Sequence, residues 1–436
     1  MNVKQILNTL TAALPASDLP DYDCNNGALL RVIDNASPCH FENALAAAND
    51  AGFVSFSQNE LENNLYETLV RSDAVAHIYY CPAEKKLRLI ADPNTVLFDP
   101  APTPYAHRCE PKLWQFETDH TFIDCGMCFI LQNADNSYFV IDSGHFLQPN
   151  DHRRIYRFLR ERTPVCEKVV IAGWFFSHGH DDHVCQFMEF LNDRYKDVVI
   201  EKLYYNMICP YGRDSRFWKE SNKKIAFDFE KAAEGSGIPI VKLHSGQRFY
   251  VRNLQIDVLC THEDVYPNDF ENYNDSSTVL MIETDGCRIS IPGDAGGFES
   301  DVLTGRFTEK TLRCDVMQQA HHGHFGTSVE YYRMSNAKVV LFPTTQIKFE
   351  EELPNYEANR VAIELADEYH VSSNGTVEVP IPYVPETVRV LRDETFENFD
   401  RIQALWGYTY TDEYKQKLFD AYLRRSGLPP MDEIDP

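Results

Sequence analysis

The sequence predicts an α/β protein in which two mixed β-sheets pack face to face and carry helices on their outer faces. Between residues 111 and 383, strand-like apolar runs alternate with amphipathic helical patterns. Several of these runs are neighbours joined by short turns, for example Thr278–Glu283 and Arg288–Pro292. Paired strands mixed with long helices indicate two layered sheets with helices outside.

The chain of 436 residues divides into three zones. Residues 1–110 are expected to form a small N-terminal α/β accessory domain, and the Pro-rich stretch Asp99–Pro104 is typical of a linker. Residues 111–383 form the predicted two-sheet domain. Residues 384–436 form a predicted polar C-terminal extension with a helix at Asp412–Arg424. At about 100–200 residues per domain, the chain is long enough for this arrangement.

The N-terminal zone combines a helical pattern with strands. Phe41–Ala51 predicts a helix, Gly52–Phe56 a strand, and Ala74–Ala91 a hairpin. The hairpin carries Tyr79 and Tyr80, which could form a contact between copies of the chain or cover a site on the second domain. A homo-oligomer formed through this zone is therefore one expectation.

The central zone supplies the strands and helices of the two-sheet domain. Its strand candidates are Phe129–Leu131, Tyr138–Asp142, Val169–Phe176, Val198–Tyr205, Gln255–Cys260, Thr278–Glu283, Arg288–Pro292, Asp315–Gln318 and Val339–Phe342. Its helix candidates are Asp151–Arg162, His183–Tyr195, Lys223–Ala233 and Thr327–Arg333.

The chain is strongly acidic, with a formal net charge of −25. Nucleic acids bind largely through Lys and Arg contacts to phosphate, so we expect a small-molecule substrate rather than polymeric nucleic acid. The same charge disfavours docking on anionic membranes. The first residues lack the apolar run of a secretion signal, and no run of about 18 apolar residues follows. These features predict a cytoplasmic protein.

The 12 cysteines are scattered, and only Cys125 and Cys128 form a Cys-x-x-Cys pair. The scatter is typical of reduced core thiols in a cytosolic protein. Because the pair opens an apolar strand, we expect core thiols there too. A redox pair or half of a zinc site is the alternative.

The strongest chemical signal follows the apolar run that ends at Phe176. It is Ser-His178-Gly-His180-Asp-Asp182-His183, with three histidines within six residues. His178 and His180 alternate along an extended segment, so both face the same way. Asp182 and His183 come after the chain has turned and would face a second position nearby. Imidazole nitrogens and a carboxylate are ligands that suit zinc in catalytic sites, whereas chance histidines on a polar turn are the alternative.

Two further strands end in candidate ligands. One leads to Asp294, whose carboxylate at a strand end could bridge two cations. The other leads to His321 and His322, either of which could complete the shell of the second metal. The alternatives are an ordinary turn aspartate and a surface cluster of histidines.

Asp142 ends another strand, Tyr138–Asp142. Its carboxylate could accept a hydrogen bond from a ligand imidazole and so fix the tautomer of that ring. It could equally be an ordinary turn residue.

In this order the motifs resemble those of the metallo-β-lactamase superfamily, over about residues 111–382. The first motif matches the pattern His-x-His-x-Asp-His, and the strand ending in Ile-Asp-Ser-Gly is similar to another motif of the superfamily. The resemblance implies an αββα sandwich with two divalent metal ions at one edge. It implies these ligands: His178 and His180 for the first metal, Asp182 and His183 for the second, and Asp294 bridging both.

The resemblance also bears on the two adjacent histidines. The last ligand in the superfamily often precedes a Gly, which favours His322 over His321. His321 would then support a ligand or contact a substrate oxygen. We expect Asp182 and His321 to take part in catalysis, with either His321 or a metal-bound water protonating the leaving group.

Two details refine the resemblance. The stretch Asn274–Leu280, together with Gly-Asp-Ala and His-His-Gly, is similar to the nuclease-like domain of bacterial DNA-uptake channels and to phosphorylcholine esterases. Many superfamily members also supply a histidine from a Pro-Gly-His turn, whereas the corresponding interval here holds only His244 and His262. The first metal would then take a water or an oxygen of Asn274 or Asp275, and a one-metal site is an alternative.

We therefore expect a metal-dependent hydrolase that uses a metal-activated hydroxide. Two cations about 3.5–4 Å apart lower the pKa of a shared water from about 15.7 towards roughly 7. A small phosphodiester is the expected substrate and zinc the expected metal, while iron and manganese fit the same ligands. The alternatives are hydrolysis of a lactone or amide at the same centre and a non-catalytic metal-binding module.

Overall fold

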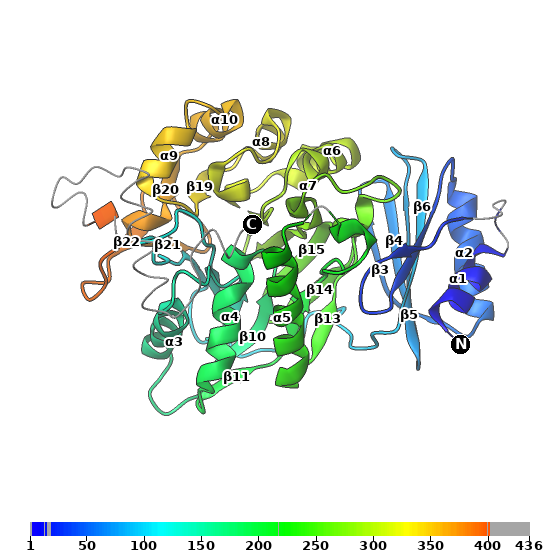
Figure 1. The fold of residues 1–436 in the computed structure, drawn as a ribbon, viewed down its shortest axis with the longest axis horizontal. Helices are drawn as coiled ribbons and strands as arrows, with labels where there is room; N and C mark the ends of the chain where they lie inside the picture. Colours follow the sequence, from blue (N-terminus) through cyan, green and yellow to red (C-terminus); the bar gives the residue numbers. More distant parts are fainter. Residues whose placement is uncertain (1, 13, 15–18, 217, 399, 402–436) are drawn as a thin grey trace.

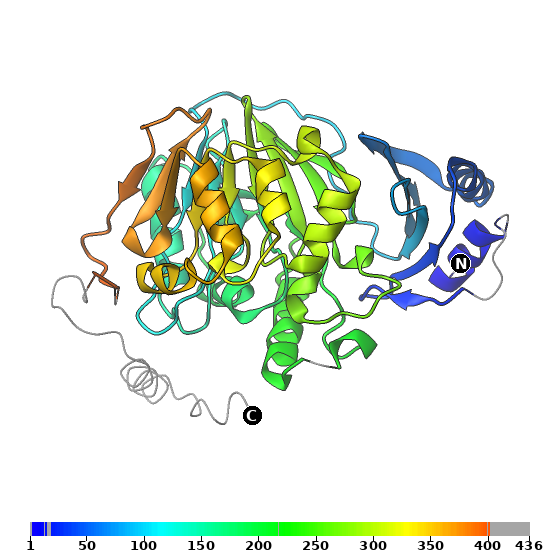
Figure 2. The same cartoon turned by 90° about the horizontal axis from the view of Figure 1, so that it is seen from above.

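The computed structural model describes residues 2–12, 14, 19–216, 218–398 and 400–401. Three sheets organise this part of the chain, with six, nine and seven strands. The larger two pack face to face with helices outside them, which confirms the predicted αββα sandwich of two mixed sheets (Figures 1 and 2). The helix predicted at Asp412–Arg424 lies outside the described residues.

The nine-stranded sheet has the order β13-β12-β10-β9-β8-β7-β21-β22, and β11 also pairs with β10. Its strands are β7 (Lys112–Gln115), β8 (Phe129–Gln132), β9 (Tyr138–Ile141), β10 (Val169–Phe175), β11 (Val198–Ile200), β12 (Leu203–Tyr205), β13 (Ile240–Lys242), β21 (Thr376–Pro380) and β22 (Arg389–Leu391). The sheet is mixed because β9, β10 and β12 run parallel whereas β7, β8 and β9 run antiparallel. Strand β22 lies within the range expected as a C-terminal extension.

The seven-stranded sheet has the order β14-β15-β16-β17-β18-β19-β20. Its strands are β14 (Arg248–Val251), β15 (Leu254–Cys260), β16 (Val279–Thr284), β17 (Cys287–Ile291), β18 (Val316–Gln318), β19 (Val339–Phe342) and β20 (Glu368–Val371). The strands from β14 to β17 are antiparallel, and those from β17 to β20 are parallel.

Alternating side chains create three apolar layers in the sandwich. In β8, Phe129 and Leu131 point between the sheets, whereas Ile130 points to the outer helices. The nine-stranded sheet is covered by α3 (Asp151–Arg162), α4 (Asp181–Asp193) and α5 (Glu220–Ser236). The seven-stranded sheet is covered by α6 (Gly297–Arg306), α7 (Glu309–Leu312), α8 (Val329–Ser335), α9 (Gln346–Glu352) and α10 (Glu357–Leu365). Within the described ranges, every helix is too short or too polar to cross a bilayer.

Two predicted elements differ from the structure in their bounds. Helix α4 begins at Asp181, two residues before the predicted start, because acidic side chains in a first turn interact favourably with the helix dipole. The segment predicted as one strand, Val198–Tyr205, forms β11 and β12 instead. Between them, Glu201 pairs with Arg252 and Lys202 with Asp99, which interrupts the apolar run.

The N-terminal sheet stands at one end of the sandwich (Figure 1). It is antiparallel, in the order β1-β2-β6-β5-β4-β3. Its strands are β1 (Tyr22–Asp23), β2 (Leu29–Ile33), β3 (Val54–Leu61), β4 (Asn64–Arg71), β5 (Ala74–Cys81) and β6 (Lys86–Asp92). One face packs against α1 (Val3–Thr11) and α2 (Pro38–Asp50), and the other against the sandwich.

The hairpin predicted at Ala74–Ala91 is present as β5 and β6, but its tyrosines do not face solvent. Tyr79 is fully buried and its hydroxyl donates to Asp264 Oδ1 of the sandwich at 2.8 Å. Tyr80 is buried on the opposite face, against the helices. Both rings are therefore used within the chain rather than presented on its surface.

Candidate metal centre

Three loops that follow strands of the two sheets converge on one pocket. The first follows β10 and runs into α4, the second follows β17, and the third follows β18 as the short helix η4 (Ala320–Gly323). Together they carry every metal ligand predicted from the sequence: His178, His180, Asp182, His183, Asp294 and His322.

The ligand atoms form two groups that share Asp294. In each group, one ligand atom from every residue lies within 4.8 Å of the others. One group is Asp182, His183, Asp294 and His322, and the other is His178, His180 and Asp294. A carboxylate common to two ligand groups has the geometry of a bridging ligand.

The two oxygens of Asp294 face different imidazoles. His183 Nε2 lies 3.3 Å from Asp294 Oδ1. His322 Nε2 lies 3.4 Å from Asp294 Oδ2, and His178 Nε2 lies 3.9 Å from the same oxygen. His322 Nε2 also lies 3.0 Å from Asp182 Oδ2, so the histidine after β18 is surrounded by carboxylates.

Several of these atoms are buried without a hydrogen-bond partner in the described chain. They are His183 Nε2, His322 Nε2 and Asp294 Oδ1. Leaving a buried donor or acceptor unpaired costs about 1–3 kcal/mol each. A divalent cation would satisfy imidazole nitrogens and a carboxylate oxygen together, so the residues present fit a metal centre.

The electrostatics of the two groups differ. Burial lowers the pKa of His178 well below its ordinary value, so this ring presents a neutral nitrogen. Burial also opposes charge on His322, but the carboxylates of Asp294 and Asp182 outweigh it and raise the pKa of His322 to about 10. The pKa of His183 is raised well above its usual value against burial in the same way. The second group therefore attracts positive charge, as a cation site must.

Asp142 contacts the ring nitrogen of His183 that does not face Asp294. Its Oδ2 lies 2.7 Å from His183 Nδ1, and it also accepts from the amide and hydroxyl of Ser177. A carboxylate accepts the Nδ1 proton, which leaves Nε2 free to face Asp294. Of the two roles left open by the sequence, the hydrogen bond to an imidazole is the one present.

His321 and His322 occupy different environments, although they are adjacent. Both have left-handed backbone, with φ of 49° and 57°, which turns their side chains apart. His322 is buried within the group around Asp294, and its Nδ1 donates to Pro343 O at 2.8 Å. His321 is partly exposed in the pocket and its Nε2 lies 4.0 Å from Asp294 Oδ2.

Asn274 and Asp275, either of which was expected to offer an oxygen to the first metal, lie in different environments. Asn274 Nδ2 donates to His321 Nε2 at 3.0 Å, and Asn274 Oδ1 is buried without a partner among the described residues. Asp275 instead accepts from the backbone amides of Glu271 and Asn272. Asn274 is therefore the one with an unused oxygen beside the centre.

The pocket over the centre has a volume of about 370 Å³. Besides the ligands it is lined by an apolar wall and by the start of α5, with Lys219, Ser221 and Asn222. Nothing in the sequence links this helix start to the histidine motif, because they meet only through the packing of α5 on α4. Cys125 lines the pocket whereas Cys128 is buried, and both thiols are free.

Tyr273 is a second contributor that the sequence analysis missed. Its ring packs against His178 and His180, with centroids 5.9 and 4.6 Å away. A Cβ at Gly179 would lie 2.3 Å from Tyr273 Oη, so the glycine between the two histidines makes room for this ring. In the sequence, the glycine between His178 and His180 indicates that another group approaches the backbone closely there.

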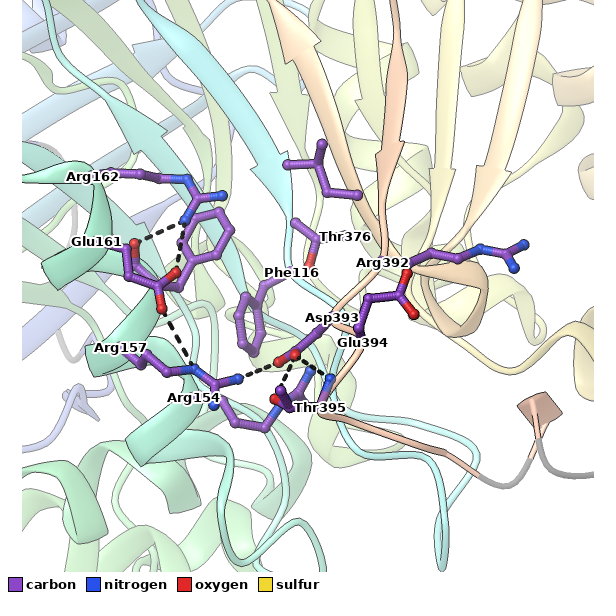
Figure 3. Close-up of a pocket in the computed structure, with 12 residues that line it drawn as sticks. Phe116, Arg154, Arg157, Glu161, Arg162, Thr376, Arg392, Asp393, Glu394 and Thr395 are labelled. Carbon is purple, nitrogen blue, oxygen red and sulfur yellow. Dashed lines mark hydrogen bonds and ion pairs between the residues drawn. The ribbon is translucent and has the colours of Figure 1, made fainter.

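Another cavity, of about 290 Å³, lies between α3 and the segment after β22, and it is lined by none of the metal-centre residues (Figure 3). Three of its four arginines are engaged in ion pairs: Arg154 with Asp151, Arg157 with Asp393, and Arg162 with Glu161. The pair of Arg157 and Asp393 joins α3 to the segment after β22.

No protein-family model matches the chain, and no curated protein matches it. Solved structures do match. One is the metallo-β-lactamase fold protein YhfI from Bacillus subtilis, at 11% identity and a TM-score of 0.38, over 60% of this chain and 97% of that one. Another is the short form of human tRNase Z, at 11% identity and a TM-score of 0.33, over 55% of this chain and 94% of that one. A third is CmlA, a diiron β-hydroxylase from Streptomyces venezuelae, at 14% identity and a TM-score of 0.31, over 75% of this chain and 53% of that one. Likeness at this level assigns no activity to the chain, and the αββα architecture rests on its own sheets and core.

Proposed function

We propose that this protein is a metal-dependent hydrolase of the metallo-β-lactamase type, and that it cleaves a small phosphodiester at a centre of two divalent ions. His178 and His180 would hold the first ion, and Asp182, His183 and His322 the second. The observation that carries the proposal is the position of Asp294, which belongs to both ligand groups and has a buried oxygen without a hydrogen bond.

Divalent ions bound there supply Lewis acidity and lower the pKa of a water, which removes the need for a side-chain nucleophile. The chain's own residues hold the ligands in place. Asp142 accepts the Nδ1 proton of His183, and Pro343 O accepts that of His322. Both rings therefore present Nε2 to the centre, in the tautomer that binds metals.

His321 is the residue placed to handle a proton. Its Nδ1 lies 3.0 Å from Phe325 O, a carbonyl that can only accept, so Nδ1 carries the hydrogen. Nε2 then faces the pocket with a lone pair that accepts from Asn274. To protonate a leaving group, Nε2 would take up the proton of the attacking water in place of the hydrogen bond from Asn274, while the other N–H stays satisfied by Phe325 O.

With two divalent ions offsetting the carboxylates of Asp182 and Asp294, the pocket would favour a small anionic substrate. A volume of about 370 Å³ accommodates a small molecule. Lys219 stands at the N-terminal end of α5, where its ammonium and the helix dipole both favour a negative group. A phosphodiester carries such a charge, whereas a lactone does not.

An ester panel tests the proposal. Metal-loaded wild type should hydrolyse bis(p-nitrophenyl) phosphate, and Asp294→Ala should lose the activity, while Asp269→Ala, at an exposed site, should keep it. Activity on lactones or a chromogenic β-lactam, without activity on the diester, would replace the phosphodiesterase proposal by a carbonyl hydrolase. A metal-loaded protein that is inactive on every substrate would indicate a binding module instead.

A further inference from the structure

A second set of metal-ligating side chains lies where the N-terminal sheet packs against the sandwich. Cys24 follows β1, while His262 and Glu263 belong to the short helix η2 (His262–Asp264) after β15. The Cys24 sulfur, a ring nitrogen of His262 and a carboxylate oxygen of Glu263 all lie within 4.8 Å of one another, and all three residues are buried. None of the three belongs to the centre around Asp294.

His262 is held in the form that binds metals. Its Nδ1 lies 3.3 Å from Asn206 O, so Nδ1 carries the hydrogen and Nε2 carries the lone pair. Burial lowers the pKa of His262 to about 4, which keeps the ring neutral. Nε2 is buried and has no hydrogen-bond partner anywhere in the described ranges. A fully buried ring nitrogen without a partner requires an explanation, and a bound ion would provide one.

Glu263 is a fixed anion beside it. Its Oε1 accepts from His244 Nδ1 at 2.7 Å and from Asn206 Nδ2 at 2.9 Å. Although burial opposes its charge, His244 outweighs this and lowers the pKa of Glu263 to about 2. Such outer contacts orient a ligand carboxylate. Asn206, which contacts both residues, keeps its own Oδ1 buried and unpartnered within the described chain, and it is the candidate for a fourth ligand.

The Cys24 thiol also lacks a strong interaction. The only hydrogen bond described for its sulfur is 4.0 Å long, to Tyr22 O, and none joins it to His262 or Glu263 in the part of the chain that the structure describes. Burial raises the pKa of Cys24 well above its ordinary value, so without a cation it is a thiol. Binding of a divalent ion would form a sulfur–metal bond and release the thiol proton to solvent.

We propose that Cys24, His262 and Glu263 bind a structural zinc ion that joins the N-terminal sheet to the sandwich. A thiolate with an imidazole and a carboxylate is a ligand set for zinc, and it excludes magnesium and calcium, which take oxygen ligands. The ion would link residues more than 200 positions apart in the sequence. It would stabilise an interface that already contains Tyr79 and Asp264.

Cobalt substitution tests this site separately from the Asp294 centre. A thiolate bound to Co²⁺ gives a charge-transfer band in the near ultraviolet, whereas imidazole and carboxylate ligands do not. Full-length wild type loaded with Co²⁺ should show the band, and Asp294→Ala should keep it. Cys24→Ser should lose both the band and one equivalent of cobalt. Cys125→Ser is the matched control, because that thiol lines the other pocket, and it should keep the band.

A wild type without the band, or a band that survives Cys24→Ser, would overturn the proposal. If Cys24→Ser does not fold, X-ray absorption at the zinc edge of the Cys125→Ser protein tests the site instead. Cys24 is intact in that protein. That protein should show a sulfur neighbour about 2.3 Å from zinc. A spectrum with only nitrogen and oxygen neighbours would rule the site out.

Discussion

Asp142 Oδ2 lies 2.7 Å from His183 Nδ1, and both side chains are fully buried. The carboxylate therefore fixes which ring nitrogen of His183 faces Asp294. Two sheet-end loops are joined by this contact, since Asp142 follows β9 and His183 lies in the first turn of α4. The geometry of the proposed second metal depends on it.

Asp142→Ala should lower metal affinity by about 10–100-fold, because such supporting contacts typically contribute that much. Competition with a chromogenic chelator measures the affinity directly. Asp269→Ala, at an exposed site, serves as the control and should bind as the wild type does. An Asp142→Ala protein with unchanged affinity would show that the tautomer of His183 is set in another way.

Gly179→Ala should destabilise the loop between the two histidines, because the new methyl group would meet Tyr273 Oη at 2.3 Å. Overpacking of this kind costs about 1–3 kcal/mol of unfolding free energy. Tyr273→Phe removes the clashing oxygen, so the double variant should recover much of the loss in urea unfolding. Gly235→Ala, in α5 with nothing within 4 Å, is the control and should stabilise slightly. An equal loss in the single and double variants would place the strain elsewhere.

Glu299 makes the stability of the fold decrease as the pH rises from about 5 to 8. Burial, with the charge of Asp275, raises the pKa of Glu299 to about 8. The folded state thus holds a proton that the unfolded state releases above its ordinary pKa, so this group's contribution to stability is greatest below that pKa and is lost as pH rises towards 8. Glu299→Gln should become more stable relative to the wild type between pH 5 and 8 in denaturant titrations. A difference that is constant with pH would contradict a neutral Glu299.

Lys219→Ala should raise KM for an anionic diester and leave KM for a neutral ester unchanged. A solvent-exposed ion pair contributes up to about 1 kcal/mol, which corresponds to roughly fivefold. Steady-state kinetics on bis(p-nitrophenyl) phosphate and p-nitrophenyl acetate separate the two effects. Lys224→Ala, on the exposed side of α5, should change neither. A parallel change for both esters would assign Lys219 a structural role.

Much of the centre could be predicted because its ligands sit at strand ends within short motifs. The spacing of His178, His180 and His183 is local, so the sequence alone places these rings together. The choice of His322 over His321 comes only from the resemblance, through the Gly that follows His322, because the residue pattern does not reveal that both histidines have left-handed backbone.

The sequence does not predict the residues that tertiary packing alone brings to the site. Lys219 lines the pocket from the start of α5, and Tyr273 packs against His178 and His180 from the short helix η3 (Tyr273–Ser276). Both lie far along the chain from the histidine motif. The short strands β13 and β20 were also missed, because three or four residues show no clear period. The site proposed at Cys24 joins segments whose proximity depends on how the N-terminal sheet docks.

The central claim is that Asp294 serves two metal ions at once. Elemental analysis of purified, metal-loaded variants tests it most directly. Relative to the wild type, His178→Ala and His322→Ala should each lose one equivalent, and Asp294→Ala should lose two. Retention of both equivalents by Asp294→Ala, or loss of the same single equivalent in all three variants, would contradict a shared carboxylate.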